Sequence, residues 1–166
     1  TNIRRVVEAL NADSIVIKPR LDLLQMIFGR VLTDNPYPMK ALERASGICN
    51  ACIGFVKNIT LRLAIENRIP IIAYGWSPGQ APISAAMFRM NGSMVRQMHD
   101  ARSAPLLDIA GDMVRPYLLD ESHFAEQTEF PHNVNPLAFH DYDEHRIVEL
   151  IETLGWEAPK DTDGNS

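Results

Sequence analysis

The chain has 166 residues, of which 46% are hydrophobic and 22% are charged, and its formal net charge is −5. This length and composition predict a single soluble globular unit, with no apolar run long enough to cross a membrane and no signal peptide. Two cysteines without a secretory segment argue against a disulfide-stapled extracellular domain and predict a cytoplasmic protein. The basic residues concentrate in the first 70 residues, a mild bias that does not indicate a nucleic-acid-binding arm.

The first part of the chain contains two predicted helices and one predicted strand. Apolar residues at helical spacing predict a helix over residues 2–10. The β-branched run Ser14–Ile17 predicts a short strand that ends before a proline. A second amphipathic helix is predicted over residues 24–31, and the turn-forming residues 34–36 end it.

Cys49 and Cys52, the only two cysteines of the chain, stand three residues apart before a long helical pattern. Two thiols at this spacing can chelate a soft metal, anchor an iron–sulfur cluster or cycle to a disulfide. A closed tetrahedral site needs four ligands, so it must borrow histidines, accept outside ligands or be completed by further chain. We predict that the pair binds zinc or an iron–sulfur cluster; the alternative is two reduced cysteines that only pack.

The helical pattern over residues 52–66 is followed by a second predicted strand at Ile71–Tyr74, which is continuously apolar as buried parallel strands are. This strand runs into a glycine turn at the sheet edge where α/β proteins bind ligands. Glycine permits close backbone approach, and tryptophan can stack on a base or sugar. The alternative is a strand-to-helix connection in which the tryptophan only packs. The predicted nucleotide-binding residues are Lys18, Gly75, Trp76, Ser77, Gly79 and Gln80.

Two further cations are candidate catalytic groups. Lys57 lies on the polar face of the predicted helix at 52–66, and Arg89 lies in the helical pattern after the glycine turn. Either side chain can neutralise the charge of pyrophosphate, Arg as a planar fork and Lys as a point charge. The alternative for both is a solvated surface position.

The remainder of the chain is predicted to be mostly helical. Helical patterns are present at 82–90, 93–99 and 104–118, and they include four methionines at helical spacing that predict core or interface. Residues 120–137 are predicted to be irregular, and 136–140 extended. A final helix is predicted to begin with Asp141 as N-cap and Glu144 reaching back to it. We divide the chain into a core at 1–118 and an irregular segment with a C-terminal helix at 119–166.

These elements predict an α/β fold that contains part of a parallel sheet. Two buried-type strands joined by a crossover of some fifty residues have the sense of a βαβ unit. Two strands leave unpaired edges, so we expect further strands from missing chain or from a partner, such as a second copy. The start inside a helix and the shortage of strands predict a fragment cut at both ends, which should self-associate.

Several segments in this order resemble the PP-loop ATP pyrophosphatase superfamily, also called the adenine nucleotide alpha hydrolases. They are Asn2-Ile3 with Arg5-Val6-Val7, Asp13 to Pro19, Gly47 to Cys52, Ile69-Pro70 leading to Gly75 to Gln80, and Leu154-Gly155-Trp156 with Pro159 and Asp161. The resemblance implies a Rossmann-like fold that binds ATP with Mg²⁺. Such proteins resemble N-acetyl sugar amidotransferases and tRNA thiolation enzymes, which split ATP into AMP and pyrophosphate while they adenylate a substrate.

The superfamily's glycine-rich phosphate loop, SGGxDS, does not occur in this chain. Backbone N–H groups of such a loop must approach the phosphates closely, so the chain alone is predicted to lack ATP pyrophosphatase activity. The resemblance therefore implies the carboxyl-side part of an ATP-dependent adenylating enzyme, which serves amide or sulfur transfer to a sugar, a tRNA or a small acid. The alternative is a metal-binding or interaction module that kept the fold without the catalysis.

Overall fold

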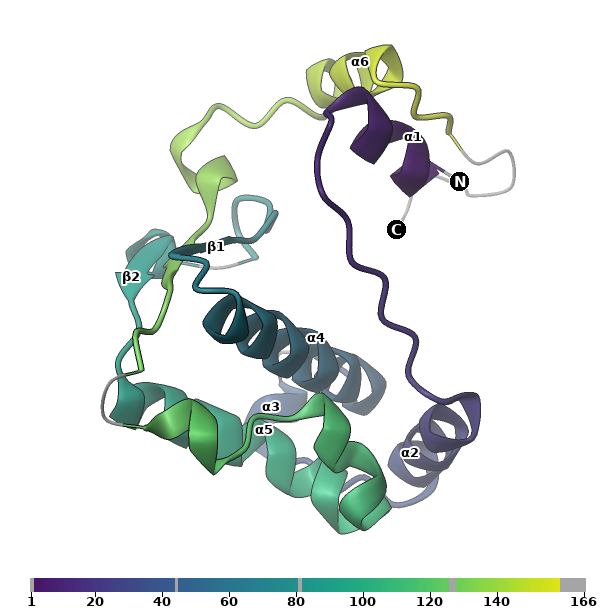
Figure 1. The fold of residues 1–166 in the computed structure, drawn as a ribbon. Helices are drawn as coiled ribbons and strands as arrows, with labels where there is room; N and C mark the ends of the chain where they lie inside the picture. The colour runs from purple at the N-terminus through teal and green to yellow at the C-terminus, as the bar shows by residue number, and fades with distance from the viewer. Residues whose placement is uncertain (1, 44, 81, 126–127, 159–166) are drawn as a thin grey trace. The chain divides into compact units, whose positions relative to one another are not determined.

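A computed structural model describes residues 2–43, 45–80, 82–125 and 128–158. The chain forms two compact units (Figure 1). One unit is Pro19–His140, and the other combines Thr1–Lys18 with Asp141–Ser166. The boundaries of these units differ from the division into 1–118 and 119–166 that we expected from the sequence.

The unit Pro19–His140 is helix-rich and has a small mixed sheet. Its helices are α2 (Leu21–Thr33), α3 (Met39–Leu42), α4 (Gly47–Glu66) and α5 (Gly92–Ala110). Its strands are β1 (Ile71–Ala73), β2 (Met87–Arg89) and β3 (His132–Val134). The sheet order is β1-β3-β2, in which β1 and β3 are parallel and β2 is antiparallel to β3. The broad expectation of a helix-rich α/β fold is confirmed. The sheet contains one parallel pair, but this pair joins β1 to β3 and not to the strand expected at Ser14–Ile17.

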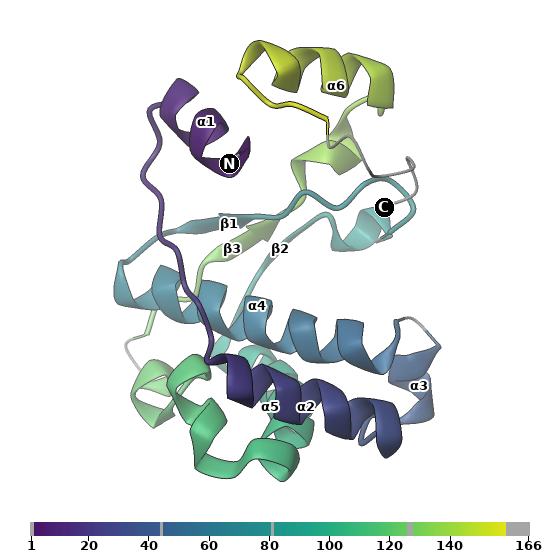
Figure 2. The same cartoon turned by 90° about the vertical axis from the view of Figure 1, so that its right-hand side faces the viewer.

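Within this unit, helix α4 lies between the sheet and the helices α2 and α5 (Figure 2). On one side it packs against α2 and α5, where Leu23, Ile27 and Val31 of α2 are buried. The helix predicted over residues 24–31 is thus confirmed as part of α2. On the other side a second cluster joins Ala64 of α4 to Ile72 of β1. Ser46 is the N-cap of α4, and its side chain accepts a hydrogen bond of 3.2 Å from the backbone N–H of Cys49.

By length and composition alone, α4 is also apolar enough to cross a membrane, with a mean hydropathy of 1.4 over an 18-residue window. The expectation that no run of this length exists is therefore wrong. About a quarter of that window, 28%, is buried in the structure. A core helix of a globular domain passes the same test, so the criterion does not distinguish the two.

The strand predicted at Ile71–Tyr74 is confirmed as β1, and the backbone N–H of Tyr74 donates to the Val134 carbonyl at 2.9 Å. The expected burial of both its faces is wrong, because only Ile72 is buried. The strand predicted at Ser14–Ile17 is also wrong: these residues are exposed and outside any strand. A β-branched run becomes a strand only where a neighbour supplies the ladder, and β3 supplies it to β1.

Several other segments have a secondary structure that differs from the one predicted. Residues 82–90, expected to be helical, form a 3₁₀ turn and then β2, because β3 offers ladder hydrogen bonds there. The segment 120–137, expected to be irregular, contains β3. The helices expected at 93–99 and 104–118 are one helix, α5, followed by a 3₁₀ helix. Residues 136–139, expected to be extended, are a 3₁₀ turn.

The smaller unit contains α1 (Asn2–Ala9) and α6 (Glu144–Thr153), both expected from the sequence. Asp143, and not Asp141, caps α6 by accepting from the Arg146 backbone N–H at 3.2 Å. The Asn2 side chain donates to the Glu157 carbonyl at 2.7 Å and accepts from the Glu157 N–H at 3.1 Å. These bonds join segments near the two ends of the described chain.

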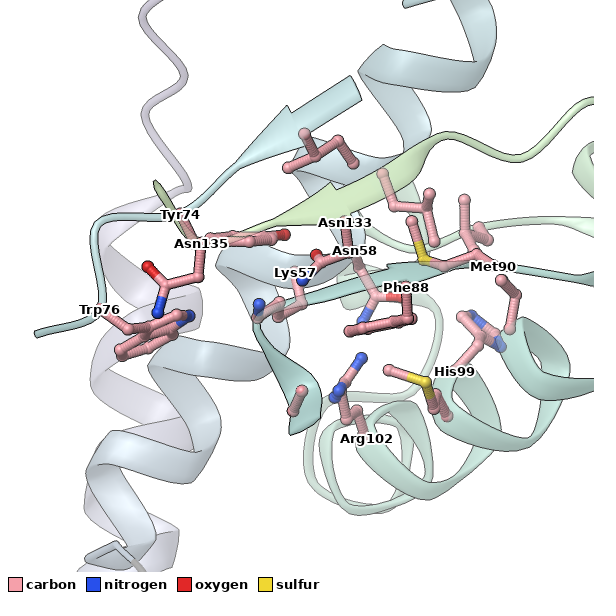
Figure 3. A pocket seen from close by; sticks show the side chains of 16 residues that line it. Lys57, Asn58, Tyr74, Trp76, Phe88, Met90, His99, Arg102, Asn133 and Asn135 are labelled. Carbon is pink, nitrogen blue, oxygen red and sulfur yellow. The ribbon is translucent and has the colours of Figure 1, made fainter. Parts of the chain in front are cut away.

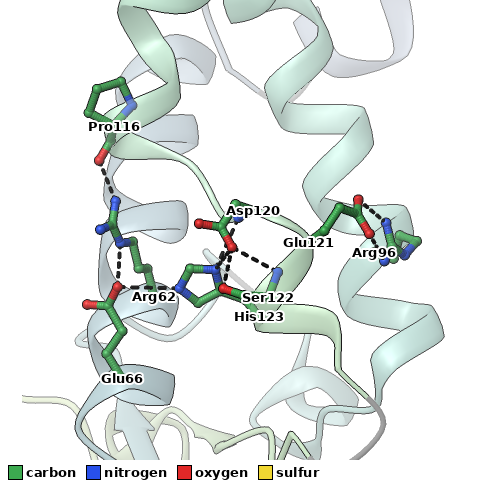
Figure 4. Close-up of polar contacts among 8 residues, drawn as sticks. All are labelled: Arg62, Glu66, Arg96, Pro116, Asp120, Glu121, Ser122 and His123. Carbon is green, nitrogen blue, oxygen red and sulfur yellow. Dashed lines mark hydrogen bonds and ion pairs between the residues drawn. The ribbon is translucent and has the colours of Figure 1, made fainter.

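His123 is the centre of a polar network that ties the segment after α5 back to α4 (Figure 4). Its ring is 6% exposed, with Nδ1 at 2.8 Å from Asp120 Oδ1 and Nε2 at 3.4 Å from Glu66 Oε1. Arg62 donates to the same Glu66 oxygen at 2.7 Å and to the Pro116 carbonyl at 2.6 Å. A buried polar ring is tolerated here because both of its nitrogens have partners.

Leu106 tests the helix core. It is fully buried on α5, so Leu106→Ala should lower the free energy of unfolding by about 2–5 kcal/mol, because it removes packing and leaves a cavity. Leu32→Ala on α2 is the matched control: that leucine is 72% exposed, and its change should stay within about 0.5 kcal/mol. Urea unfolding followed by circular dichroism measures both. Equal losses in the two variants would contradict this packing.

Candidate functional site

A cavity of about 180 Å³ lies in the unit Pro19–His140, lined by α4, α5 and the sheet (Figure 3). Much of its wall is apolar, from residues such as Leu61, Ile72 and Phe88. Its polar lining comes from three places in the sequence. These side chains are Lys57 and Asn58 on α4, His99 and Arg102 on α5, and Tyr74, Trp76, Asn133 and Asn135 in or after β1 and β3.

The parallel strand pair positions one end of the cavity. Because β1 and β3 are parallel, the residues that follow them, Tyr74 and Trp76 on one and Asn135 on the other, lie at the same sheet edge. The backbone N–H of Asn135 donates to the Ala86 carbonyl at 2.6 Å, which fixes this residue against the segment before β2. The Tyr74 and Trp76 rings are stacked, with centroids 6.3 Å apart.

Lys57 reaches the aromatic pair from α4. Its Nζ lies 3.1 Å from the centroid of the Tyr74 ring and 5.4 Å from that of Trp76, so the ammonium group faces both π-systems. Burial, and then the charge of Arg102, lower the pKa of Lys57 to about 8. Burial also lowers the pKa of Arg102, although a guanidinium remains charged at neutral pH.

No Asp or Glu stands among the described residues that line this cavity. Lys57 and Arg102 therefore place two like charges in a half-buried space without a counter-charge on its wall. Desolvation makes such a pair costly, and an anion that enters the cavity would offset part of that cost. The cavity is thus suited to a small anion.

Two buried polar atoms of the lining have no hydrogen-bond partner in the described part of the chain. They are Nε2 of His99 and Oδ1 of Asn135. The other ring nitrogen of His99 lies 3.2 Å from Asp100 Oδ1, and the amide of Asn58 is used within α4, where it donates to the Gly54 carbonyl at 2.9 Å. Because unpaired buried polar atoms are rare, His99 and Asn135 are the groups best placed to meet a ligand.

The structure brings together only two of the residues that the sequence singled out. Lys57 and Trp76 line the cavity. Ser77 and Gln80 are hydrogen-bonded to each other, since the Ser77 backbone N–H donates to Gln80 Oε1 at 2.7 Å, and they close the turn. Gly79 has φ +91°, which explains a glycine at that position of the turn.

The other predicted cations lie elsewhere. Arg89 on β2 lines a separate groove with Arg68 and His132, outside the cavity. Lys18 is exposed and belongs to the smaller unit. Gly75 is exposed, and no atom lies within 4 Å of the position that a Cβ would take there.

Cys49 and Cys52 are free and exposed on the first turns of α4. Burial and the proximity of Cys49 raise the pKa of the Cys52 thiol, which opposes the thiolate form expected at a helix start. No group of three or more Cys, His, Asp or Glu side chains within the described ranges is arranged to hold a metal ion. The two thiols are thus an incomplete donor set for a tetrahedral zinc site, and metal binding stays a prediction.

Sequence reasoning missed Arg102, His99 and Asn135. One signal for the first two was present: Val95, Met98, His99 and Arg102 recur at spacings of three and four on α5, so two basic side chains interrupt an apolar stripe. Asn135 follows a strand that pairs with neighbours about sixty and forty-five residues away, and no local pattern marks it.

No protein-family model, curated protein or solved structure matches the chain. The resemblance to the PP-loop superfamily therefore stays a hypothesis, and the cavity residues themselves are the grounds for a function.

Lys57 gives a pH-dependent test of the cavity. The group has a pKa of about 8 when folded and 10.5 as a free side chain, so between these values the unfolded chain binds more protons and stability rises with pH. Below about pH 8 the cost of the buried charge is fully present. Lys57→Met should therefore be more stable than the wild type at neutral pH, and this advantage should shrink between about pH 8 and pH 10. Urea unfolding at several pH values measures it; a constant difference would contradict the buried charge.

Proposed function

We propose that the cavity of the unit Pro19–His140 binds a small organic anion that carries a flat aromatic or apolar part. The observation that carries this proposal is the pair Lys57 and Arg102, two cations in one cavity whose described lining has no carboxylate. The aromatic rings of Tyr74 and Trp76 beside them suit the flat part of the ligand.

The arrangement supports binding more than it supports a structural role. A cavity that existed only for packing would be filled by apolar side chains, which cost less to bury than a Lys–Arg pair. Arg102 presents a planar fork that matches carboxylate or phosphate oxygens, and Lys57 adds a point charge. The ligand's anionic group therefore meets the two cations, and its flat part lies against the aromatic rings.

An adenine nucleotide is one ligand of this chemistry, and the sequence interpretation favours it. In that form of the proposal, the unit is a Rossmann-like nucleotide-binding fold, and the phosphate of AMP meets Lys57 and Arg102 while the base contacts Trp76. The position of the cavity at the carboxyl end of the parallel strand pair supports it. Adenylation by ATP with Mg²⁺ would require the phosphate loop that this chain lacks, so the proposal here covers binding.

Direct titration tests the proposal. Calorimetry with AMP and with aromatic carboxylates should detect binding to the wild type, and Lys57→Met and Arg102→Gln should each weaken it by about tenfold or more, because each removes a charge-assisted contact. A Trp156→Phe background leaves Trp76 as the single tryptophan, whose fluorescence should change on binding.

The cations that the sequence singled out serve as matched controls. Arg89→Gln and Lys18→Met remove the same charges at positions outside the cavity and should leave the affinity within about twofold. If these variants weakened binding as much as the cavity variants, the anion would bind elsewhere. Absence of binding by every anion tested, at concentrations up to the millimolar range typical of metabolites, would overturn the proposal.

A further inference from the structure

Lys57 differs from the other lysines of the described chain in its surroundings. Lys18 and Lys40 are exposed, whereas Lys57 is half-buried and lines the cavity. Its ammonium group faces the Tyr74 ring and makes no ion pair with any described Asp or Glu. A lysine desolvated among aromatic rings and next to a second cation is the setting in which an amine becomes nucleophilic.

We propose that Lys57 is a nucleophile that forms an imine with the carbonyl group of a small oxo acid, and that Arg102 binds the carboxylate of that acid. The inference rests on the proposed function, because an oxo acid is a small organic anion of the class that the cavity suits. The inference goes beyond the proposed function because it assigns a covalent step and one substrate class.

The geometry supplies the parts that this step needs. Figure 3 shows Lys57 entering from α4 and Arg102 from α5, and both line the same cavity. The guanidinium can hold a carboxylate bidentately, which leaves the neighbouring carbonyl group of the oxo acid for the amine. A volume of about 180 Å³ suits a small acid, and the rings of Tyr74 and Trp76 form a wall for an aromatic substituent.

The reaction balances without an oxidant or a further reactant. The neutral amine of Lys57 attacks the carbonyl carbon, and a carbinolamine forms as the C=O double bond becomes a C–O single bond. Both protons of the amine end on that oxygen, which leaves as water, and a C=N bond remains. His99 lines the same cavity, and its buried Nε2 has no hydrogen-bond partner in the described chain.

The charges around Lys57 agree with this role. The charge of Arg102 on α5 acts on Lys57, and the Tyr74 ring lies against its ammonium group. Elsewhere in the lining, α5 contributes His99, and β3 and the residue after it contribute only the neutral amides Asn133 and Asn135. Burial and the charge of Arg102 lower the pKa of Lys57 to about 8, so a usable fraction of the amine is neutral near pH 7.5. Solvent-exposed lysines have a far smaller neutral fraction at that pH.

Reductive trapping tests the proposal. The full chain is incubated with pyruvate or phenylpyruvate and cyanoborohydride, which reduces an imine to a stable secondary amine, and peptide mass mapping then locates the adduct. Lys57 should be labelled about tenfold faster than Lys18 and Lys40, and its labelling should rise from about pH 6 to about pH 8 as more of the amine is neutral. Lys57→Arg keeps a cation but should show no adduct at this position.

Arg102→Gln tests the carboxylate contact. It should raise the concentration of oxo acid needed for half-maximal labelling by about tenfold, and Arg102→Lys should restore part of that loss. 3-Phenyllactate, which has no carbonyl group, should compete with phenylpyruvate and slow the labelling. Circular dichroism confirms that each variant is folded.

Each outcome is informative. Labelling of Lys57 no faster than that of Lys18 and Lys40, or unchanged by Arg102→Gln, overturns the inference. Binding of AMP or 3-phenyllactate that depends on Lys57 and Arg102, without an adduct, leaves the proposed function standing and overturns the covalent step. Absence of both binding and adduct overturns the two together.

Discussion

The unit Pro19–His140 depends on α4, which must pack on two sides at once. One side approaches α5 so closely at Gly54 that a Cβ there would lie 3.2 Å from Leu106 Cδ1 and 3.6 Å from the Arg102 carbonyl. The other side supports β1 through Ala64 and Ile72. Because one helix serves both layers, the side chains between them, Lys57 among them, have neighbours from α5 and from the sheet.

The cavity lies where these layers meet, because its lining comes from α4, from α5 and from the sheet. Much of that lining is apolar, and the rest includes cations and amides. Buried charges in natural folds are usually paired. Exceptions occur chiefly at functional sites, where the binding of a ligand offsets the cost of burying the unpaired charge. The like charges of Lys57 and Arg102, and the unpartnered atoms of His99 and Asn135, are such exceptions within one cavity.

The short sheet shows how little secondary structure is needed to build a binding edge. Each strand has three residues, and β3 holds the sheet together as the centre of both ladders. Its parallel partner β1 directs Tyr74 and Trp76 to the same end as Asn135. A polar network around His123 ties part of the chain between α5 and β3 back to α4.

The sequence by itself determined the elements whose signal is local. The apolar spacing over residues 24–31 predicted α2, a long apolar pattern predicted α4, and the run Ile71–Tyr74 predicted β1, because helix and strand periods are properties of neighbouring residues. It also selected two residues that line the cavity: Lys57, as a cation on the polar face of a predicted helix, and Trp76, from its position after a predicted strand.

Tertiary structure decided the remainder. Ser14–Ile17 has a strand-like composition but no pairing partner, whereas the polar run at His132–Val134 becomes a strand because β1 and β2 lie on either side of it. The packing of α5 against α4 places Arg102 in the cavity. Arg89 lies on β2 next to Phe88 of the cavity lining, and because successive strand residues point to opposite faces, it lies outside the cavity. Pairing and desolvation depend on residues distant in the chain, so a local pattern does not carry them.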